Sequence, residues 1–161
     1  NFGLDETLAA RGGKVVRTKV GDRYVIEEMV RQKLNLGGEQ SGHVIFRDFT
    51  TTGDGIITAL QILRVMHKTG HPLSKLKACL QKYPQAQRNL AVKEKRPLAE
   101  LGSVMKLVMQ AEKELSGKGR VLLRYSGTEP KIRLLIEGRE FEMIDKQADR
   151  IADAIQTAIG A

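Results

Sequence analysis

The sequence of 161 residues contains no tryptophan, and aromatic residues make up only 4% of it. A core must therefore be built from aliphatic side chains, a composition that favours helices layered on sheets. The single cysteine, Cys79, can form neither an internal disulfide nor a zinc cluster. No apolar run reaches the roughly 18 residues needed to cross a bilayer, which predicts no membrane contact. The hydrophobic fraction of 41% supports a folded core and excludes overall disorder.

The first ten residues have neither the basic start nor the apolar stretch of a signal peptide, which predicts a cytoplasmic protein. The sequence does not begin with Met. We therefore expect it to be a processed chain or a part of a longer one.

The net charge of +8 is concentrated in one segment. Residues 67–96 hold 8 basic and 1 acidic side chains, and the sequence on either side is nearly balanced. A basic excess is typical of proteins that bind nucleic acids or phosphorylated molecules. A solvated, lysine-rich connector is the simpler interpretation of this segment, and we adopt it.

The first half of the sequence has the pattern of an incomplete α/β domain over residues 1–68. The expected elements are helices over 4–11, 23–34 and 56–67 and strands over 14–20 and 43–49. This order resembles part of a three-layer αβα domain with a mixed or parallel sheet, but no strand precedes the first helix. We therefore expect an open sheet edge with exposed apolar surface.

The second half has the pattern of a small, complete α+β domain. Gly and Pro punctuate a basic linker over residues 69–84, and the second domain follows over 85–161. Its expected order is β-α-β-β-α, with Ser103 as the N-cap of the first helix. The expected elements are strands over 86–93, 121–125 and 131–137, a helix after 103, and a final helix from about 140. The final helix is expected to bury a regular apolar stripe made of Phe141, Ile144, Ala148, Ile151, Ile155 and Ile159.

The motif RYSGTEPKIR, residues 124–133, predicts a phosphate site. Gly127 permits a tight turn of backbone N–H groups, to which the hydroxyls of Ser126 and Thr128 add donors. Arg124 and Arg133 lie on the two flanking strands, where each can grip an oxyanion with two N–H groups. The alternative is an ordinary hairpin loop with two surface arginines.

A second motif, LGGEQSGH over residues 36–43, suits hydrogen bonding to neighbouring sugar hydroxyls. Glu39, Ser41 and His43 offer an acceptor, a hydroxyl and an imidazole. The glycine spacing is not that of a dinucleotide-binding loop. Taken alone, this motif also fits a plain turn.

The sequence indicates neither a metal site nor a catalytic nucleophile. Asp22 and Asp54 follow glycines near expected helix starts, where carboxylates commonly act as caps. No serine has a neighbouring His and acid arranged as a nucleophile site would need.

GGEQSGH followed about ninety residues later by RYSGTEPKIR resembles the α-D-phosphohexomutase superfamily. With Gln40 after Glu39, the first motif is similar to that of the phosphoglucosamine mutase branch. The resemblance implies a four-domain enzyme, of which this sequence would be a C-terminal fragment with most of domain 3 and all of domain 4. The phosphoserine loop and the Mg²⁺ loop belong to the absent domains, so the resemblance implies no catalytic residue and no bound metal here.

By the same resemblance, two sets of residues bind the substrate. The sugar-binding set is Glu39, Ser41 and His43, with Gly21 and Asp22 from a neighbouring loop. The phosphate-binding set is Arg124, Ser126, Gly127, Thr128 and Arg133.

The implied activity of the full-length enzyme is the interconversion of glucosamine 6-phosphate and glucosamine 1-phosphate for amino-sugar and peptidoglycan precursors, with Mg²⁺ as cofactor. The implied partners are a phosphorylated hexosamine, the missing N-terminal domains or a second chain covering the exposed edge of domain 3, and a homodimer as a further option.

The alternative functions are those of a phosphomannomutase or phosphoglucomutase, and of a basic nucleic-acid-binding module. The absence of aromatic platforms argues against nucleic acid.

Overall fold

A computed structural model describes residues 1–161 and divides them into two compact units. One unit contains Asn1–Gly3 and Lys82–Ala161, and the other contains Leu4–Gln81. Both combine helices with a small antiparallel sheet, so the α/β class predicted from the sequence is confirmed. No helix in the structure is long and apolar enough to cross a membrane.

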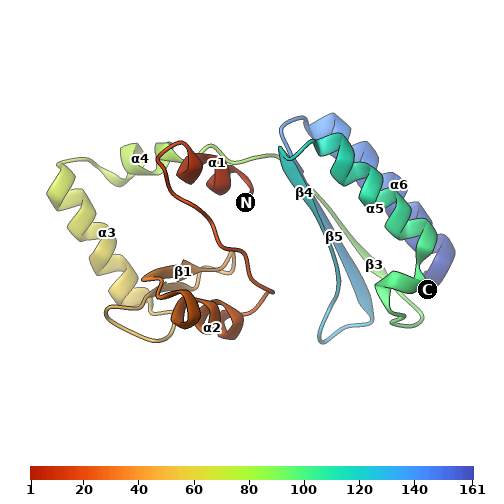
Figure 1. Ribbon diagram of the computed structural model, residues 1–161, viewed down its shortest axis with the longest axis horizontal. Helices are drawn as coiled ribbons and strands as arrows, with labels where there is room; N and C mark the ends of the chain where they lie inside the picture. Colours follow the sequence, from red (N-terminus) through yellow and green to blue (C-terminus); the bar gives the residue numbers. More distant parts are fainter. The chain divides into compact units, whose positions relative to one another are not determined.

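The unit of residues 82–161 is a three-stranded antiparallel sheet with two helices packed on one face (Figure 1). The sheet has the order β3-β5-β4, and the chain order β-α-β-β-α agrees with the sequence prediction. Its elements are β3 (Gln85–Ala91), the short 3₁₀ helix η2 (Leu98–Glu100), α5 (Gly102–Leu115), β4 (Gly119–Tyr125), β5 (Lys131–Gly138) and α6 (Phe141–Ile159).

Alternation along β5 decides which face of this sheet is covered. Ile132, Leu134 and Ile136 are at most 1% exposed and belong to the same core as the buried residues of α5 and α6. Side chains between them must point to the opposite face because successive residues of a strand alternate. We call this opposite side the helix-free face, and it carries Arg133 and Leu135.

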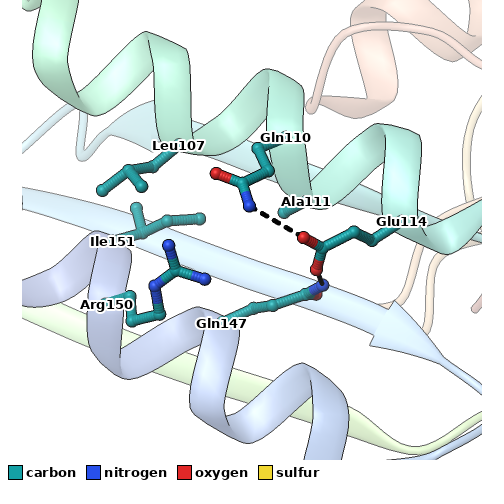
Figure 2. Close-up of a pocket in the computed structure, with 7 residues that line it drawn as sticks. All are labelled: Leu107, Gln110, Ala111, Glu114, Gln147, Arg150 and Ile151. Atoms are coloured by element: carbon teal, nitrogen blue, oxygen red, sulfur yellow. Dashed lines mark hydrogen bonds between the residues drawn. The ribbon is translucent and has the colours of Figure 1, made fainter.

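A polar network joins the two helices on their outer side (Figure 2). Gln110 Nε2 donates to Glu114 Oε1 at 2.9 Å, and Gln147 Nε2 donates to Glu114 Oε2 at 2.6 Å. These two hydrogen bonds hold the pKa of Glu114 below its usual range, and the bond from Gln147 has the larger effect. The network fixes α5 against α6 and lies on the helix side of the sheet.

Glu137 is a fully buried carboxylate at the end of β5. Arg120 Nε donates to Glu137 Oε2 at 2.6 Å, Gln85 Nε2 donates to Oε1, and the α-amino group of Asn1 lies 4.0 Å away. Burial by itself would raise the pKa of Glu137, but the hydrogen bonds from Arg120 and Gln85 outweigh it, so the pKa lies below its usual range.

The unit of residues 4–81 is mainly helical. Its elements are α1 (Gly3–Ala9), α2 (Asp22–Gln32), the two-stranded antiparallel sheet of β1 (Leu36–Gly38) and β2 (Val44–Phe46), α3 (Gly55–Thr69), α4 (Leu73–Leu76) and the 3₁₀ helix η1 (Lys77–Cys79). The prediction of a strand over 14–20 was wrong, because these residues pair with no other strand. β1 lies in the glycine-rich stretch where the sequence predicted only a loop, and the only strand pairing in this unit is antiparallel.

The core of residues 4–81 is small. Only Val25, Met29 and Ile45 form its buried cluster. The apolar helix α3 has no buried residue at all, and Ile56 is 76% exposed. Other exposed apolar side chains of this unit include Val30, Leu36, Phe49, Leu60 and Leu63. The predicted exposure of apolar surface in the first half is therefore observed.

Two local predictions in the second half were wrong. Ser103 does not cap α5, because the helix begins at Gly102 and its N-cap is Leu101, which accepts no capping bond. Phe141 was expected on the buried stripe of α6 but is 52% exposed at the first turn of the helix, whereas Ile144, Ile151 and the rest of the stripe are buried.

Candidate functional site

The two arginines of the RYSGTEPKIR motif lie directly opposite each other on neighbouring strands. Arg124 of β4 pairs in register with Arg133 of β5. Both side chains point to the helix-free face because Ile132 and Leu134, on either side of Arg133, point into the core. Arg124 makes no hydrogen bond or ion pair in the structure, so its guanidinium group is available to a ligand.

The turn between the arginines is closed by hydrogen bonds at its base. Ser126 is 3% exposed, its N–H donates to the carbonyl of Lys131 at 2.8 Å, and its Oγ accepts from the N–H of Glu129 at 3.4 Å. The N–H groups of Gly127 and Thr128 make no hydrogen bond within the protein. The turn therefore offers two backbone donors at its exposed tip.

The backbone conformation of Gly127 differs from the one that the sequence indicated. Its φ is not positive, so the turn does not depend on the conformational freedom of glycine. A Cβ added at Gly127 would meet nothing within 4 Å. The space beside its backbone is open, as close approach by a ligand requires.

Glu129 occupies part of the predicted anion site. Its carboxylate accepts from Arg133 Nη2 at 3.0 Å and from Lys131 Nζ at 2.5 Å. The hydrogen bond from Lys131, followed by that from Arg133, holds the pKa of Glu129 below its usual range. Sequence reasoning assigned no role to Glu129, although it stands inside the motif, because only the fold shows that its side chain turns back to Arg133.

Sequence reasoning also missed Lys95, which it placed in a solvated connector. Lys95 Nζ donates to the carbonyl of Ser126 at 2.7 Å. The two residues are 31 positions apart. No local pattern in the sequence signals this contact.

The second motif forms the hairpin between β1 and β2. The turn is closed by the N–H of Glu39, which donates to the carbonyl of His43 at 2.9 Å. Ser41 Oγ lies 2.9 Å from His43 Nδ1 and donates to Glu39 Oε2 at 3.4 Å. The structure therefore brings the three predicted side chains into one cluster, in which His43 remains half-exposed.

Gly21 joins this cluster and Asp22 does not. The N–H of Gly21 donates to Glu39 Oε1 at 2.8 Å, and Gly21 has a φ of 132°, which disfavours any other residue there. Asp22 Oδ1 accepts from the N–H of Arg23 at 2.7 Å, at the start of α2. Asp54 caps α3 by accepting from the N–H of Ile57, as the sequence predicted.

Neither motif forms a metal centre. The structure contains no group of three or more His, Cys, Asp or Glu side chains that could hold a metal ion. The residues present do not fit Mg²⁺, which takes several oxygen ligands. Cys79 is exposed and forms no disulfide.

The comparisons with known proteins match both halves of the chain to one family. Residues 1–83 match "Phosphoglucomutase/phosphomannomutase, alpha/beta/alpha domain III", and residues 88–154 match the C-terminal domain of the same family. A phosphoglucosamine mutase from Anaeromyxobacter sp. (strain Fw109-5) is 54% identical over 160 residues, which are 99% of this chain and 34% of that protein. The chain thus spans about a third of the length of this curated relative.

Solved structures agree on the fold. A serine-to-alanine variant of Aspergillus fumigatus N-acetylphosphoglucosamine mutase, in complex with glucose 1,6-bisphosphate, has a TM-score of 0.74 at 18% identity over 97% of this chain and 36% of its own. The same Aspergillus enzyme, in complex with GlcNAc-6P and magnesium, has a TM-score of 0.53 at 25% identity over 69% of this chain and 22% of its own. The resemblance inferred from the two motifs is confirmed, and the chain belongs to the phosphoglucomutase/phosphomannomutase family.

Proposed function

We propose that this chain binds a phosphorylated sugar and that the turn after Arg124 holds the phosphate. The observation that carries the proposal is the pair of Arg124 and Arg133, placed opposite each other beside a turn with free N–H groups. Like charges in such a pair repel each other, whereas a phosphate dianion between them gains charge-assisted hydrogen bonds from both. Ser126, Gly127 and Thr128 complete the proposed set.

The cluster on the β1–β2 hairpin is the proposed sugar-binding site. Glu39 is held by the N–H of Gly21, and Ser41 bridges Glu39 and His43, so the polar groups are ordered before a ligand arrives. Ordered donors and acceptors of this kind suit sugar hydroxyls. Asp22, next to Gly21, belongs to the proposed set by its position in the chain only.

For the longer protein that contains such a chain, we propose phosphoglucosamine mutase activity. Glucosamine 6-phosphate would be converted to glucosamine 1-phosphate through a phosphoserine enzyme and a bisphosphate intermediate, for amino-sugar and peptidoglycan precursors. The name of the relative at 54% identity supports glucosamine over glucose or mannose. In this reaction the present chain binds and orients the substrate and supplies no nucleophile.

Mg²⁺ is the proposed cofactor of the longer enzyme. The magnesium complex of the Aspergillus enzyme supports this. We assign no metal ligand and no metal-dependent step to residues 1–161, because their carboxylates do not gather into a suitable group.

The exposed apolar surface of residues 4–81 supports a protein partner for this unit. α3 has no buried residue and exposes Ile56, Leu60 and Leu63, and apolar side chains that gather on an exposed surface are typical of an interaction site. We propose that further domains of the same protein or a second chain cover it, and a homodimer is one such arrangement. We further propose domain 3 over 1–68, a linker over 69–84 and domain 4 over 85–161, in a protein that acts in the cytoplasm, where sugar phosphates are retained.

Titration of the chain with glucosamine 6-phosphate and with inorganic phosphate tests the phosphate site. The double variant Arg124→Ala, Arg133→Ala should abolish binding of both ligands. A variant with Arg23→Ala and Arg31→Ala, on the exposed side of α2, removes the same charge and should bind like the parent. Unchanged binding by the first variant would refute the phosphate site.

Two further measurements separate the alternatives. Binding of generic DNA that is stronger than binding of hexosamine phosphates would favour the nucleic-acid interpretation of the basic charge. Activity of the longer protein with glucosamine 1-phosphate, compared with glucose 1-phosphate and mannose 1-phosphate, decides the sugar.

A further inference from the structure

The connector between β3 and α5 runs along the proposed phosphate loop and contacts it at both ends. The N–H of Val92 donates to the carbonyl of Pro130 at 3.0 Å, where the loop ends. Lys95 Nζ donates to the carbonyl of Ser126 at 2.7 Å, where the loop begins. Val92 is 3% exposed, so the connector is anchored in the core and its position beside the loop is fixed.

Tyr125, the residue before Ser126, packs against the core. The Tyr125 hydroxyl is buried without a hydrogen-bond partner, and this burial raises the pKa of Tyr125. Because Val92 and Tyr125 both pack in the core, the backbone on the two sides of the Lys95–Ser126 hydrogen bond is held.

Peptide geometry links this contact to ligand binding. The structure has no cis peptide bond, and in a trans peptide the C=O and the following N–H point in opposite directions. The carbonyl of Ser126 and the N–H of Gly127 belong to the same peptide. A carbonyl held by Lys95 therefore directs the Gly127 N–H to the other side, where it makes no hydrogen bond within the protein.

The charge of Lys95 is also not neutralised by a carboxylate. Glu94 and Glu100 both lie 3.9 Å from Arg96, and no ion pair includes Lys95. Its ammonium group thus adds positive charge beside a loop that already carries Arg124. It also offsets the negative end of the Ser126 carbonyl dipole, which would otherwise repel an anion.

We propose that Lys95 is a positioning residue for the phosphate loop, which directs the Gly127 N–H toward the anion and adds charge to the site. This inference rests on the proposed function of that loop. It assigns to one lysine of the basic segment 67–96 a role that the others do not share. Lys93, two residues earlier in the same connector, is exposed, and its side chain makes no hydrogen bond or ion pair.

The test is a titration of the ¹⁵N-labelled 161-residue chain with inorganic phosphate, followed by NMR. We expect Lys95→Met to raise the dissociation constant about 3- to 10-fold, in the range of one partly exposed charge-assisted hydrogen bond. It should also shift the Gly127 amide signal before any phosphate is added. Lys95→Arg restores both the donor and the charge and should bind within about twofold of the parent.

Lys93→Met is the matched control because it removes the same charge from the same connector. It should leave the Gly127 signal unchanged and affect phosphate binding less than Lys95→Met does. Equal binding by the two Met variants, with an unmoved Gly127 signal in both, would overturn the role of Lys95.

The outcome for Lys95 can be separated from that for the phosphate site itself. If the double variant Arg124→Ala, Arg133→Ala still binds phosphate, the proposed function fails. If that variant loses binding while Lys95→Met does not, only the positioning role fails. The thermal unfolding midpoint of each variant shows that a loss of binding is not a loss of fold.

Discussion

Replacement of Arg120 by Met should destabilise the unit of residues 82–161, and the loss should depend on pH. The buried Glu137 would keep Gln85 as a hydrogen-bond donor but lose the Arg120 guanidinium group. Removing one partner of a buried ion pair costs about 3–5 kcal/mol, because a charge is left without compensation. Arg120 is 27% exposed and Gln85 remains, so we expect about 2–3 kcal/mol at pH 7.

This loss is large for a unit of about 80 residues. At about 0.05–0.15 kcal/mol per residue, its whole free energy of unfolding is roughly 4–12 kcal/mol. A loss of about 2–3 kcal/mol should lower the unfolding midpoint by roughly 8–24 °C. Urea unfolding, followed through NMR signals of residues 82–161, measures the loss of free energy of unfolding without a contribution from residues 4–81.

The pH dependence follows from the direction of the Glu137 pKa. In the parent chain this pKa is lowered on folding, so the ionised carboxylate adds stability above its unfolded pKa of about 4.3, and this stability is lost as the pH falls. In the Arg120→Met variant burial should raise the pKa. The deficit should therefore be full at neutral pH, begin to shrink as the pH falls through the raised pKa of the variant, and continue to shrink until Glu137 is protonated in the parent as well, below its lowered pKa.

Two variants complete the test of the Arg120–Glu137 pair. Arg124→Met, on the same strand and face, should change the free energy of unfolding by less than about 0.5 kcal/mol because its side chain has no partner. Adding Glu137→Gln to Arg120→Met removes the buried charge and should recover part of the loss. A deficit that is the same at pH 7 and pH 3.5 would refute the electrostatic explanation.

Two further predictions concern the phosphate loop and the first unit. Glu129→Gln should tighten binding of inorganic phosphate about two- to fivefold, because the carboxylate that competes with phosphate for Arg133 is gone. The control Glu140→Gln removes the same charge without breaking an ion pair and should not tighten phosphate binding. Weaker phosphate binding by Glu129→Gln would contradict the competition. Limited trypsin digestion should cut residues 4–81 well before residues 82–161, and the first cuts should fall in segment 13–20, which has no regular structure. Mass spectrometry identifies the fragments. Equal cleavage of both units would refute the difference in packing.

The second unit could be predicted from sequence because its signals are local and agree with one another. Apolar residues recur at helical spacing in α5 and α6 and alternate in β5, and each pattern matches the face that is buried. The prediction of a strand over 14–20 was wrong because β-branched residues favour a strand only where a neighbouring strand is available to pair. β1 was missed because Gly37 and Gly38 have weak strand propensity, and their close packing against α2 and β2 shows only in the fold.

The site was predictable to the extent that its residues are contiguous. Both arginines and the turn between them stand within ten residues, so their chemistry can be recognised in the sequence. Lys95 could not be recognised, because 31 residues separate it from the carbonyl that it binds. The ligand-binding roles of both residue sets stay predictions until binding is measured.

The two proposed loops rest on scaffolds of unequal rigidity, and this difference has a functional consequence. The phosphate loop joins strands whose inner face belongs to a core of fifteen buried residues, so its geometry is fixed by packing. The hairpin with Glu39 and His43 rests on a cluster of three. Loops bind precisely when a rigid scaffold positions them. We therefore expect phosphate affinity in this chain alone, and selectivity for the sugar only after α3 and its apolar neighbours are covered by further protein.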